Sequence, residues 1–423
     1  MNSHRKWRAG ILVASLLIFG ALTVYQLLQP AGRTFSSDSA SYDAGAVNLV
    51  HSLTYSLDGT TPTMEREPGY SGFLALLYGL SSDHNRFVIF VGQYLLFLLS
   101  LGLLLAELRH RMSERVLLLT AGFLLLFPSL FHAHLSVMRE SLLASLFLLL
   151  ATAMLSLIRK PRRNAALALG FLSAAIILTG LPFLFLPFLL AGFLLMQRVS
   201  WRYLLPLLLI PFVCVGLWGI RNRVEFGRFA FGGDFRTTAM LYVRAEQAEK
   251  VHGVEAFRCL WSEYVSRDWT GRSSACSFNG LVNTKWPGRV PTAQDPEIRR
   301  ESIATILRDF PNYLWFSVFE ILEYHVPYVD GWGHLYNIAV TVAQLLLYVG
   351  CAVALFRWEK WGTVEWLCTL LAAYSLGIYI LTDATPRYHV PLLGAYAILA
   401  ATGYNTLLTR FHERRLRHHP GLQ

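Results

Sequence analysis

Long apolar runs constrain this chain more than any other feature of its sequence. Stretches of about twenty residues that are nearly free of charge recur along the chain, and an α-helix of that length crosses the hydrocarbon core of a bilayer. Only 15% of the residues are charged, whereas soluble domains carry about 25%. The sequence therefore predicts an all-α, polytopic integral membrane protein.

We predict about ten transmembrane helices from these runs. Residues 311–329 form a further apolar piece, and counting them as a span gives eleven helices. This piece contains Glu320, Glu323 and His325, so we interpret it as an interfacial or re-entrant helix. The predicted spans are residues 9–29, 87–106, 114–131, 138–158, 164–181, 183–198, 202–220, 335–356, 363–381 and 388–409.

Basic residues occur in short clusters between the apolar runs. With ten spans, all of these clusters fall on one side of the membrane, which the positive-inside rule identifies as the cytoplasm. The net charge of +10 is explained in this way, and we predict no nucleic-acid partner. We expect a multi-pass protein of a bacterial inner membrane, with the remaining loops facing the periplasm. The clusters lie at residues 4–8, 107–115, 159–164, 197–202, 356–361 and 410–419.

The chain divides by composition into a predicted N-terminal transmembrane module (1–220), an extracytoplasmic loop or small cap (221–334) and a C-terminal transmembrane module with a basic cytoplasmic tail (335–423). Within the first outer loop, residues 30–86, we predict two short interfacial helices at 39–52 and 70–80. Cys259 and Cys276 lie in the cap and form either a disulfide or two free thiols.

The first outer loop gathers charge beside the bilayer. Asp38, Asp43, Glu65, Arg66 and Glu67 lie close to the first span in an otherwise apolar chain. Charges at a membrane are costly unless they are solvated or paired, so such a cluster is a candidate functional site. The alternative is a solvated loop with ordinary surface charges.

Short motifs occur in order along almost the whole chain. The first pairs Asp38 with a tyrosine four residues later and is followed by an R-x-P-G-Y string beginning at Arg66. A glutamate, Glu140, opens the fourth span. A W-x-I-R-N-x-x-x-F-G string beginning at Trp218 closes the seventh span, and an R-Y-x-x-P string beginning at Arg387 opens the last.

In their order and placement, these motifs resemble the membrane glycosyltransferases of the C superfamily, which include protein O-mannosyltransferases and the lipid A aminoarabinose transferase. The chain departs from the family at residues 179–182, where relatives often have a basic residue before a proline, and at Ser71, where they often have a second proline. The resemblance implies an enzyme of the cell envelope, a hexosyl- or pentosyltransferase. Such an enzyme moves a sugar from a polyprenyl-phosphate carrier to a lipid, glycan or protein acceptor on the outer face.

The resemblance implies that Asp38 is the catalytic base or the carboxylate that orients the acceptor, because the acceptor must lose a proton during transfer. The alternative role for Asp38 is an N-cap of the helix expected to begin near Ser39. Asp43 lies five residues later and is a second catalytic candidate.

The leaving group is a lipid phosphate, which calls for cations near the interface. Arg66, Arg387 and Arg221 are the candidates that we expect to bind it, together with Tyr388. The alternative for each arginine is to snorkel at the end of a span. Supporting roles are implied for Tyr42, Glu67, Tyr70, Glu140, His134 and Arg139.

We predict no metal and no other cofactor, although some superfamily members use a divalent metal and this alternative stays open. His132, His134 and Glu140 have a weak metal-ligand pattern. Three other functions are alternatives: a transporter or flippase of lipid-linked sugars, an assembly protein whose outer loop binds a partner, and an O-antigen ligase. The spans carry almost no charge, whereas transporters tend to place polar groups at mid-membrane, so we favour an inverting glycosyltransferase.

Overall fold

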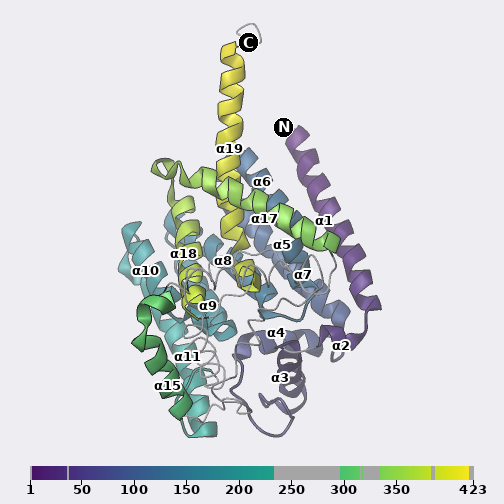
Figure 1. Cartoon of the computed structure of the whole chain (residues 1–423), viewed down its shortest axis with the longest axis vertical. Coiled ribbons are helices and arrows are strands. Elements are labelled where there is room, and N and C mark those ends of the chain that lie inside the picture. Colours follow the sequence, from purple (N-terminus) through teal and green to yellow (C-terminus); the bar gives the residue numbers. More distant parts are fainter. Residues whose placement is uncertain are drawn as a thin grey trace. The chain divides into compact units, whose positions relative to one another are not determined.

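The computed structural model describes residues 2–35, 38–232, 296–314, 317, 334–382 and 386–418, and these residues are almost entirely helical (Figure 1). Within them, the β-pairing consists of one isolated bridge between Ser56 and Pro62. The chain forms two compact units. The first unit contains Met1–Phe231, Pro327–Ser375 and His389–Gln423, and the second contains Gly232–Val326 and Leu376–Tyr388.

The helices follow the apolar runs closely. Short 3₁₀ helices at Leu181–Phe185, Trp201–Tyr203, Trp358–Lys360 and Pro386–Leu392 connect or begin them. The α-helices are α1 (Asn2–Leu28), α2 (Ala31–Thr34), α3 (Asp38–Ser52), α4 (Pro68–Gly79), α5 (Arg86–Leu108), α6 (Glu114–Leu126), α7 (Pro128–His134), α8 (Arg139–Arg159), α9 (Arg163–Thr179), α10 (Leu186–Met196), α11 (Leu204–Phe226), α15 (Pro296–Arg308), α17 (His334–Leu355), α18 (Thr363–Thr382) and α19 (Leu393–His418).

Among the described residues, six helical segments are long and apolar enough to cross a membrane, and the bent pair α6–α7 would make a seventh. Three shorter apolar helices, Arg163–Thr179, Leu181–Met196 and Thr363–Tyr379, coincide with further predicted spans. Each of the ten predicted spans is thus covered by a helix or a helix pair, which confirms a multi-pass, all-helical membrane protein. The number of crossings stays a prediction.

The predicted third span, 114–131, is not one continuous helix. Its two halves, α6 and α7, meet at an angle of 52°. Phe127 between them has an extended backbone (φ −75°, ψ 118°), as expected for a residue that precedes a proline. Pro128 cannot donate the backbone hydrogen bond that a continuous helix needs, so the break follows from the sequence.

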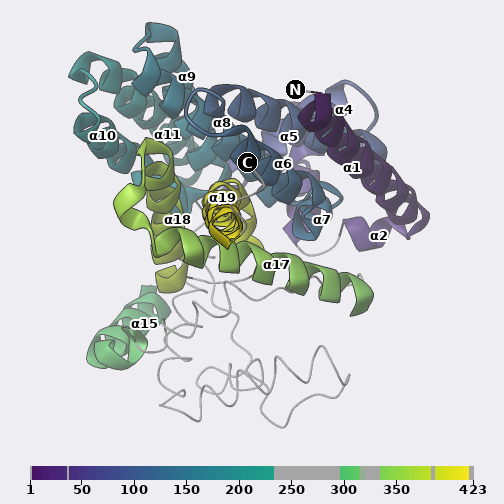
Figure 2. The ribbon, with the colours of Figure 1, turned by 90° about the horizontal axis from the view of Figure 1, so that it is seen from above.

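Helix α8 forms the centre of the first unit. It packs against α5 on one side and α9 on the other (Figure 2). Of the candidate spans it has the largest buried share, 72%. Because its first residues, Arg139 and Glu140, are buried as well, α8 carries charged groups into the interior at one end of the unit.

Figure 1 shows the start of α1 and the end of α19, which carry the first and the last predicted basic cluster, toward the same end of the first unit. Arg159 at the end of α8 forms a bidentate ion pair with Glu107 at the end of α5, with both N···O distances at 2.8 Å. Thr363 at the start of α18 donates to Gln197 Oε1 after α10, at 3.0 Å. We call this the basic end of the unit.

Helices α3 and α4 form the opposite end, which we call the α3–α4 end, and both predicted short helices are confirmed. The two helices cross closely at Gly45, where a Cβ atom would lie 2.9 Å from the Tyr55 ring and 3.0 Å from Ser71 Oγ. Ser71 Oγ donates to the backbone oxygen of Tyr42 at 3.0 Å. Ser71 therefore bonds α4 to α3.

Several predicted features lie wholly or mostly outside the described residues. These are the disulfide or thiols of Cys259 and Cys276, most of the predicted cap, and most of the predicted interfacial helix at 311–329. Within the described part of the chain, Cys214, Cys351 and Cys368 are free thiols.

Candidate functional site

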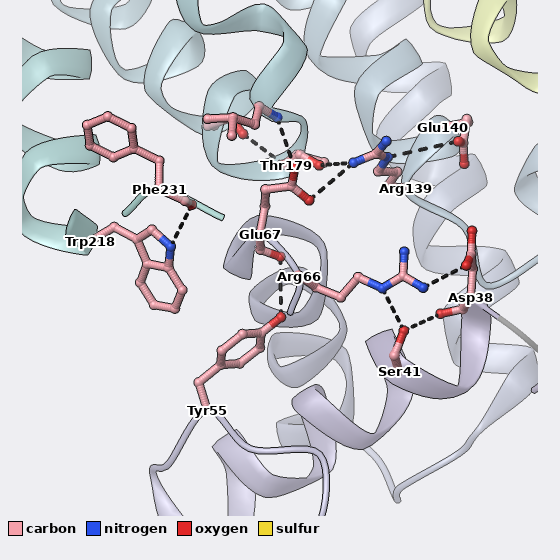
Figure 3. Close-up of polar contacts among 12 residues, drawn as sticks. Asp38, Ser41, Tyr55, Arg66, Glu67, Arg139, Glu140, Thr179, Trp218 and Phe231 are labelled. Atoms are coloured by element: carbon pink, nitrogen blue, oxygen red, sulfur yellow. Dashed lines mark hydrogen bonds and ion pairs between the residues drawn. The ribbon is translucent and has the colours of Figure 1, made fainter. Parts of the chain in front are cut away.

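Asp38 is the first residue of α3, and it forms an ion pair with Arg66. Arg66 Nη2 lies 2.6 Å from Asp38 Oδ1, and Arg66 Nε donates to Ser41 Oγ at 2.8 Å (Figure 3). Ser41 Oγ in turn donates to the Asp38 backbone oxygen at 2.8 Å. The first turn of α3 is therefore bonded to Arg66, which lies shortly before the start of α4.

The Arg66 side chain is almost fully buried, with 4% of its surface exposed, whereas 19% of the Asp38 side chain is exposed. The guanidinium carbon of Arg66 lies 4.9 Å from the centre of the Tyr42 ring, a distance typical of a cation–π contact. Arg66 Nη1 is buried and makes no hydrogen bond to any described residue. The site thus presents the partly exposed Asp38 carboxylate beside the buried Arg66 guanidinium, whose Nη1 atom is the one without a described acceptor.

Glu67 binds in a different direction, toward α8 and α9. Its Oε2 atom lies 3.2 Å from Arg139 Nη1, and its Oε1 atom accepts the Leu181 N–H at 3.2 Å (Figure 3). Arg139 Nη1 also lies 3.4 Å from the Thr179 backbone oxygen, and Arg139 Nε lies 4.0 Å from Glu140 Oε1. The adjacent residues Arg66 and Glu67 therefore form ion pairs with different helices, Arg66 with α3 and Glu67 with α8.

A buried polar chain links α4 to the segment that follows α7. Tyr70 donates from its hydroxyl to Gln93 Oε1 at 2.8 Å, and Gln93 Nε2 donates to the backbone oxygens of His134 and Ser136. The His134 side chain is fully buried and its Nδ1 atom lies 2.7 Å from Ser141 Oγ. Burial raises the pKa of the Tyr70 hydroxyl well above its usual range, so Tyr70 acts here as a neutral donor.

Asp43 belongs to a separate group of contacts. Its Oδ1 atom accepts the Tyr78 hydroxyl at 2.5 Å, and its Oδ2 atom lies 2.8 Å from His84 Nδ1. Burial, and then the adjacent carboxylate, raise the pKa of Tyr78. These contacts hold α3 against α4 and the loop before α5, and none of them is shared with Asp38.

Arg221 lies near the end of α11 and binds the first outer loop. Its Nη1 atom donates to the Thr63 backbone oxygen at 2.7 Å and its Nη2 atom donates to the Tyr55 backbone oxygen at 3.3 Å. The guanidinium carbon lies 4.9 Å from the centre of the Trp218 ring, and Trp218 meets Tyr55 edge to face. Arg221 and Trp218 of the W-x-I-R-N motif therefore both contact the loop that leads to Arg66.

Arg387 and Tyr388 lie in the second unit. The guanidinium carbon of Arg387 is 5.3 Å from the centre of the Tyr388 ring. The Tyr388 ring stacks on Tyr379, with the centroids 4.5 Å apart and the planes 19° apart. This stacking fixes the Tyr388 ring beside the arginine of the R-Y-x-x-P motif.

The structure thus gathers part of the predicted site. Asp38, Arg66 and Tyr42 form one group, and Glu67, Arg139 and Glu140 form the next along the chain (Figure 3). Sequence reasoning missed Ser41, Tyr78 and His84, which contact site residues through a hydroxyl or an imidazole. Ser41 was detectable, because it lies one helical turn after Asp38, where i, i+3 neighbours share a helix face.

Among the described residues, no group of three or more histidines, cysteines, aspartates and glutamates is placed to hold a metal ion. His134, which was weighed as a ligand, lies instead in a buried ring cluster with Tyr94 and Phe97.

We compared the chain with known proteins in three ways. No protein-family model matches it, and no curated protein matches it. Solved structures do match: the Archaeoglobus fulgidus oligosaccharyltransferase in its apo form is 12% identical, with a TM-score of 0.53, over 97% of this chain and 52% of that one. A second structure of that enzyme, AglB with an inhibitory peptide and a dolichol-phosphate, is 13% identical, with a TM-score of 0.53 over 99% of this chain.

The structure of apo ArnT from Cupriavidus metallidurans also matches, at 17% identity and a TM-score of 0.40, over 93% of this chain and 77% of that chain. This chain spans about half the length of the oligosaccharyltransferase. At 12% identity the likeness shows the fold. This chain therefore shares the membrane-embedded helical fold of the oligosaccharyltransferase over the part that the two have in common.

Proposed function

We propose that this protein transfers a glycosyl group from a polyprenyl-phosphate carrier to an acceptor at the α3–α4 end. The fold shared with an oligosaccharyltransferase supports a glycosyl transfer. A dolichol-phosphate is bound in one structure of that enzyme, which supports a polyprenyl carrier. Because the basic end carries the clusters typical of cytoplasmic loops, we place the α3–α4 end at the periplasmic face of a bacterial inner membrane.

The observation that carries the proposal is the pairing of Asp38 with Arg66. Asp38 is the more exposed partner of the pair, as a group that must reach an acceptor has to be. Arg66 Nη1 is buried without a hydrogen bond to a described residue, which ordinarily costs about 1–3 kcal/mol. A buried donor of this kind calls for an explanation, and a phosphate oxygen of the donor that accepts from it would provide one.

In the proposed reaction, an acceptor hydroxyl or amine attacks the anomeric carbon of the donor sugar. The bond from that carbon to the phosphate oxygen breaks, and its electron pair leaves with the polyprenyl phosphate. The Asp38 carboxylate takes the acceptor proton, while the Arg66 guanidinium stabilises the charge on the departing phosphate. For Arg387, Tyr388 and Arg221 we retain lipid-phosphate contacts as proposals, and for Asp43 a secondary catalytic role.

The proposal is tested by glycosyl transfer in inner-membrane vesicles, with a panel of polyprenyl-phosphate sugars and protein amounts matched by immunoblot. Asp38→Asn should abolish transfer, because the amide cannot take the acceptor proton. The matched control is Asp83→Asn, since Asp83 is another carboxylate that pairs with a basic side chain, His51, at 2.5 Å. Full transfer by Asp38→Asn removes Asp38 as the base. No transfer by the wild type with any donor favours a flippase of lipid-linked sugars.

Asp38→Asn also leaves the buried Arg66 charge unpaired, which destabilises a fold by about 3–5 kcal/mol in comparable cases. The double variant Asp38→Asn/Arg66→Met removes both charges and therefore relieves that penalty. If this variant is as stable as the wild type and still inactive, the loss of transfer reflects the chemistry rather than the fold. If it is stable and active, neither residue takes part in catalysis.

A further inference from the structure

The Glu67 carboxylate lies in a clamp formed by two helices that belong to the apolar bundle. Arg139 Nη1 at the start of α8 contacts one carboxylate oxygen, and the Leu181 N–H just after α9 contacts the other, each at 3.2 Å. Only 15% of the Glu67 side chain and 8% of the Arg139 side chain are exposed. Because both Glu67 oxygens are bound, this carboxylate is poorly suited to accept a proton from a substrate.

We propose that Glu67 is a positioning residue, which fixes the Arg66 guanidinium and, through it, Asp38. This inference rests on the proposed glycosyl transfer. Glu67 itself touches neither donor nor acceptor in this scheme. It acts by anchoring the backbone at the start of α4 to α8 and α9.

The backbone makes the coupling between Arg66 and Glu67 direct. Pro68 follows Glu67, and a residue before proline is restricted to extended conformations. Glu67 accordingly has φ −66° and ψ 140°. Figure 3 shows the Glu67 side chain directed at Arg139 and Thr179, whereas the Arg66 side chain is directed at Asp38 and Ser41 of α3.

Packing against α9 also fixes the backbone of the first residues of α4. A Cβ atom on Gly69 would lie 2.7 Å from the Leu178 backbone oxygen, so α4 begins in direct contact with the end of α9. Arg66 is bound on its other side to Asp38 and Ser41. The short segment 66–69 is thus held by α9 through Gly69, by α8 through Glu67 and by α3 through Arg66. The Glu67–Arg139 ion pair can be weakened without changing the size of any side chain and without altering Asp38, the proposed base.

Glu67→Gln tests the ion pair with Arg139 separately from the hydrogen bond with the Leu181 N–H. Glutamine has the size of glutamate and its amide oxygen still accepts the Leu181 N–H, but it carries no charge for Arg139. A displacement of about 1 Å at a catalytic group costs about 100-fold in rate. We therefore expect kcat per folded molecule to fall between tenfold and 100-fold, while KM for the polyprenyl-phosphate sugar changes less than twofold.

The measurement uses the full-length protein in proteoliposomes, with the folded fraction determined by size-exclusion chromatography. Asp83→Asn is again the control, because it neutralises a paired carboxylate away from the clamp. Glu67→Asp keeps the charge on a shorter side chain and should recover part of kcat. A role confined to stability predicts less folded protein with an unchanged kcat per folded molecule, and that result overturns the proposal.

A second measurement does not depend on activity. Hydrogen exchange of residues 42–45, whose N–H groups face the backbone oxygens of the first turn of α3, should become at least tenfold faster in Glu67→Gln and stay unchanged in Asp83→Asn. Unchanged exchange in Glu67→Gln overturns the positioning role even if the wild type transfers sugar. A wild type that transfers no sugar overturns the proposed function, while faster exchange would still establish that Glu67 fixes the Asp38 turn.

Discussion

Gly69 lies so close to Thr179 that a Cβ atom at residue 69 would stand 2.5 Å from Thr179 Oγ1. The backbone oxygen and carbon of Leu178 lie at 2.7 and 2.8 Å from the same point, so no side-chain rotation relieves the clash. The glycine of the R-x-P-G-Y motif therefore sets how closely α4 approaches the end of α9. The same contact therefore fixes the position of Arg66 and Glu67, which directly precede α4, relative to the end of α9.

The first prediction concerns this contact. Gly69→Ala should destabilise the protein by about 1–3 kcal/mol, the usual cost of forcing an extra group into a packed interior. Gly72→Ala in the same helix is the matched control, because no atom lies within 4 Å of its added Cβ and alanine favours helix formation. Thermal unfolding in detergent measures both variants. Equal melting temperatures for the two would contradict the close contact.

The sequence predicted the helices of this chain well, for physical reasons. Apolar runs of bilayer length report helices directly. The two short helices were predicted at 39–52 and 70–80, and they occur at Asp38–Ser52 and Pro68–Gly79. The break between α6 and α7 is the exception, because the apolar run continues through Pro128 although a proline cannot donate the hydrogen bond of a continuous helix.

The partners of the charged residues were not predictable in the same way. Asp38 and Arg66 are 28 residues apart, and Glu67 and Arg139 are 72 apart, so their pairing depends on how α3, α4 and α8 pack. Asp43 is predicted as a second catalytic candidate from its place five residues after Asp38. Five residues turn a helix by about 500°, which leaves the two side chains about 140° apart, and Asp43 contacts Tyr78 and His84 instead.

The second prediction tests the geometry of the Arg66 side chain. Arg66→Lys keeps the charge, but an ammonium group cannot reproduce the fork that binds Ser41 Oγ and Asp38 Oδ1 together. A hydrogen bond is lost in a nearly buried site, so we expect a destabilisation of about 1–3 kcal/mol. The exposed arginine Arg202 provides the control variant Arg202→Lys. A melting temperature that Arg66→Lys leaves unchanged would show that charge alone is sufficient.

The third prediction concerns the pH dependence of the loop that follows α3. Hydrogen bonds from the Thr61 and Thr60 backbone N–H groups, and then from the Ser56 hydroxyl, lower the pKa of Asp58 below its ordinary value of 3.8. A carboxyl whose pKa is lower in the folded state stabilises that state above its unfolded pKa, and the effect is lost as the pH falls through the folded pKa. Hydrogen exchange of residues 56–61 should therefore be slower in the wild type than in Asp58→Ala at pH 7. The difference should narrow below pH 3.8, and a constant difference down to pH 2 would refute the assignment.

The fourth prediction concerns the basic end. Arg159 and Glu107 join the ends of α8 and α5 through two N–H···O bonds of 2.8 Å, an arrangement that is both directional and charge-assisted. Glu107→Arg and Arg159→Glu should each lower the melting temperature, because each places like charges together. The double variant Glu107→Arg/Arg159→Glu should recover most of the loss. If it melts no higher than the single variants, the pair does not join the two helices.

The last prediction separates two roles of Arg221, as a lipid-phosphate ligand or as an anchor of the first outer loop. Its guanidinium donates to the backbone oxygens of Thr63 and Tyr55. Arg221→Met keeps an apolar stem against Trp218 but removes these donors, and a hydrogen bond to a charged group contributes about 1.5–3 kcal/mol. Hydrogen exchange of residues 55–63 should then become about tenfold faster or more, since 1.4 kcal/mol corresponds to a factor of ten. The exposed neighbour Arg223, which donates to the Gly227 backbone oxygen, gives the control Arg223→Met. If Arg221 instead serves the donor phosphate, loop exchange stays at the wild-type rate and KM for the donor rises, because the arginine would then contribute to binding rather than to the loop.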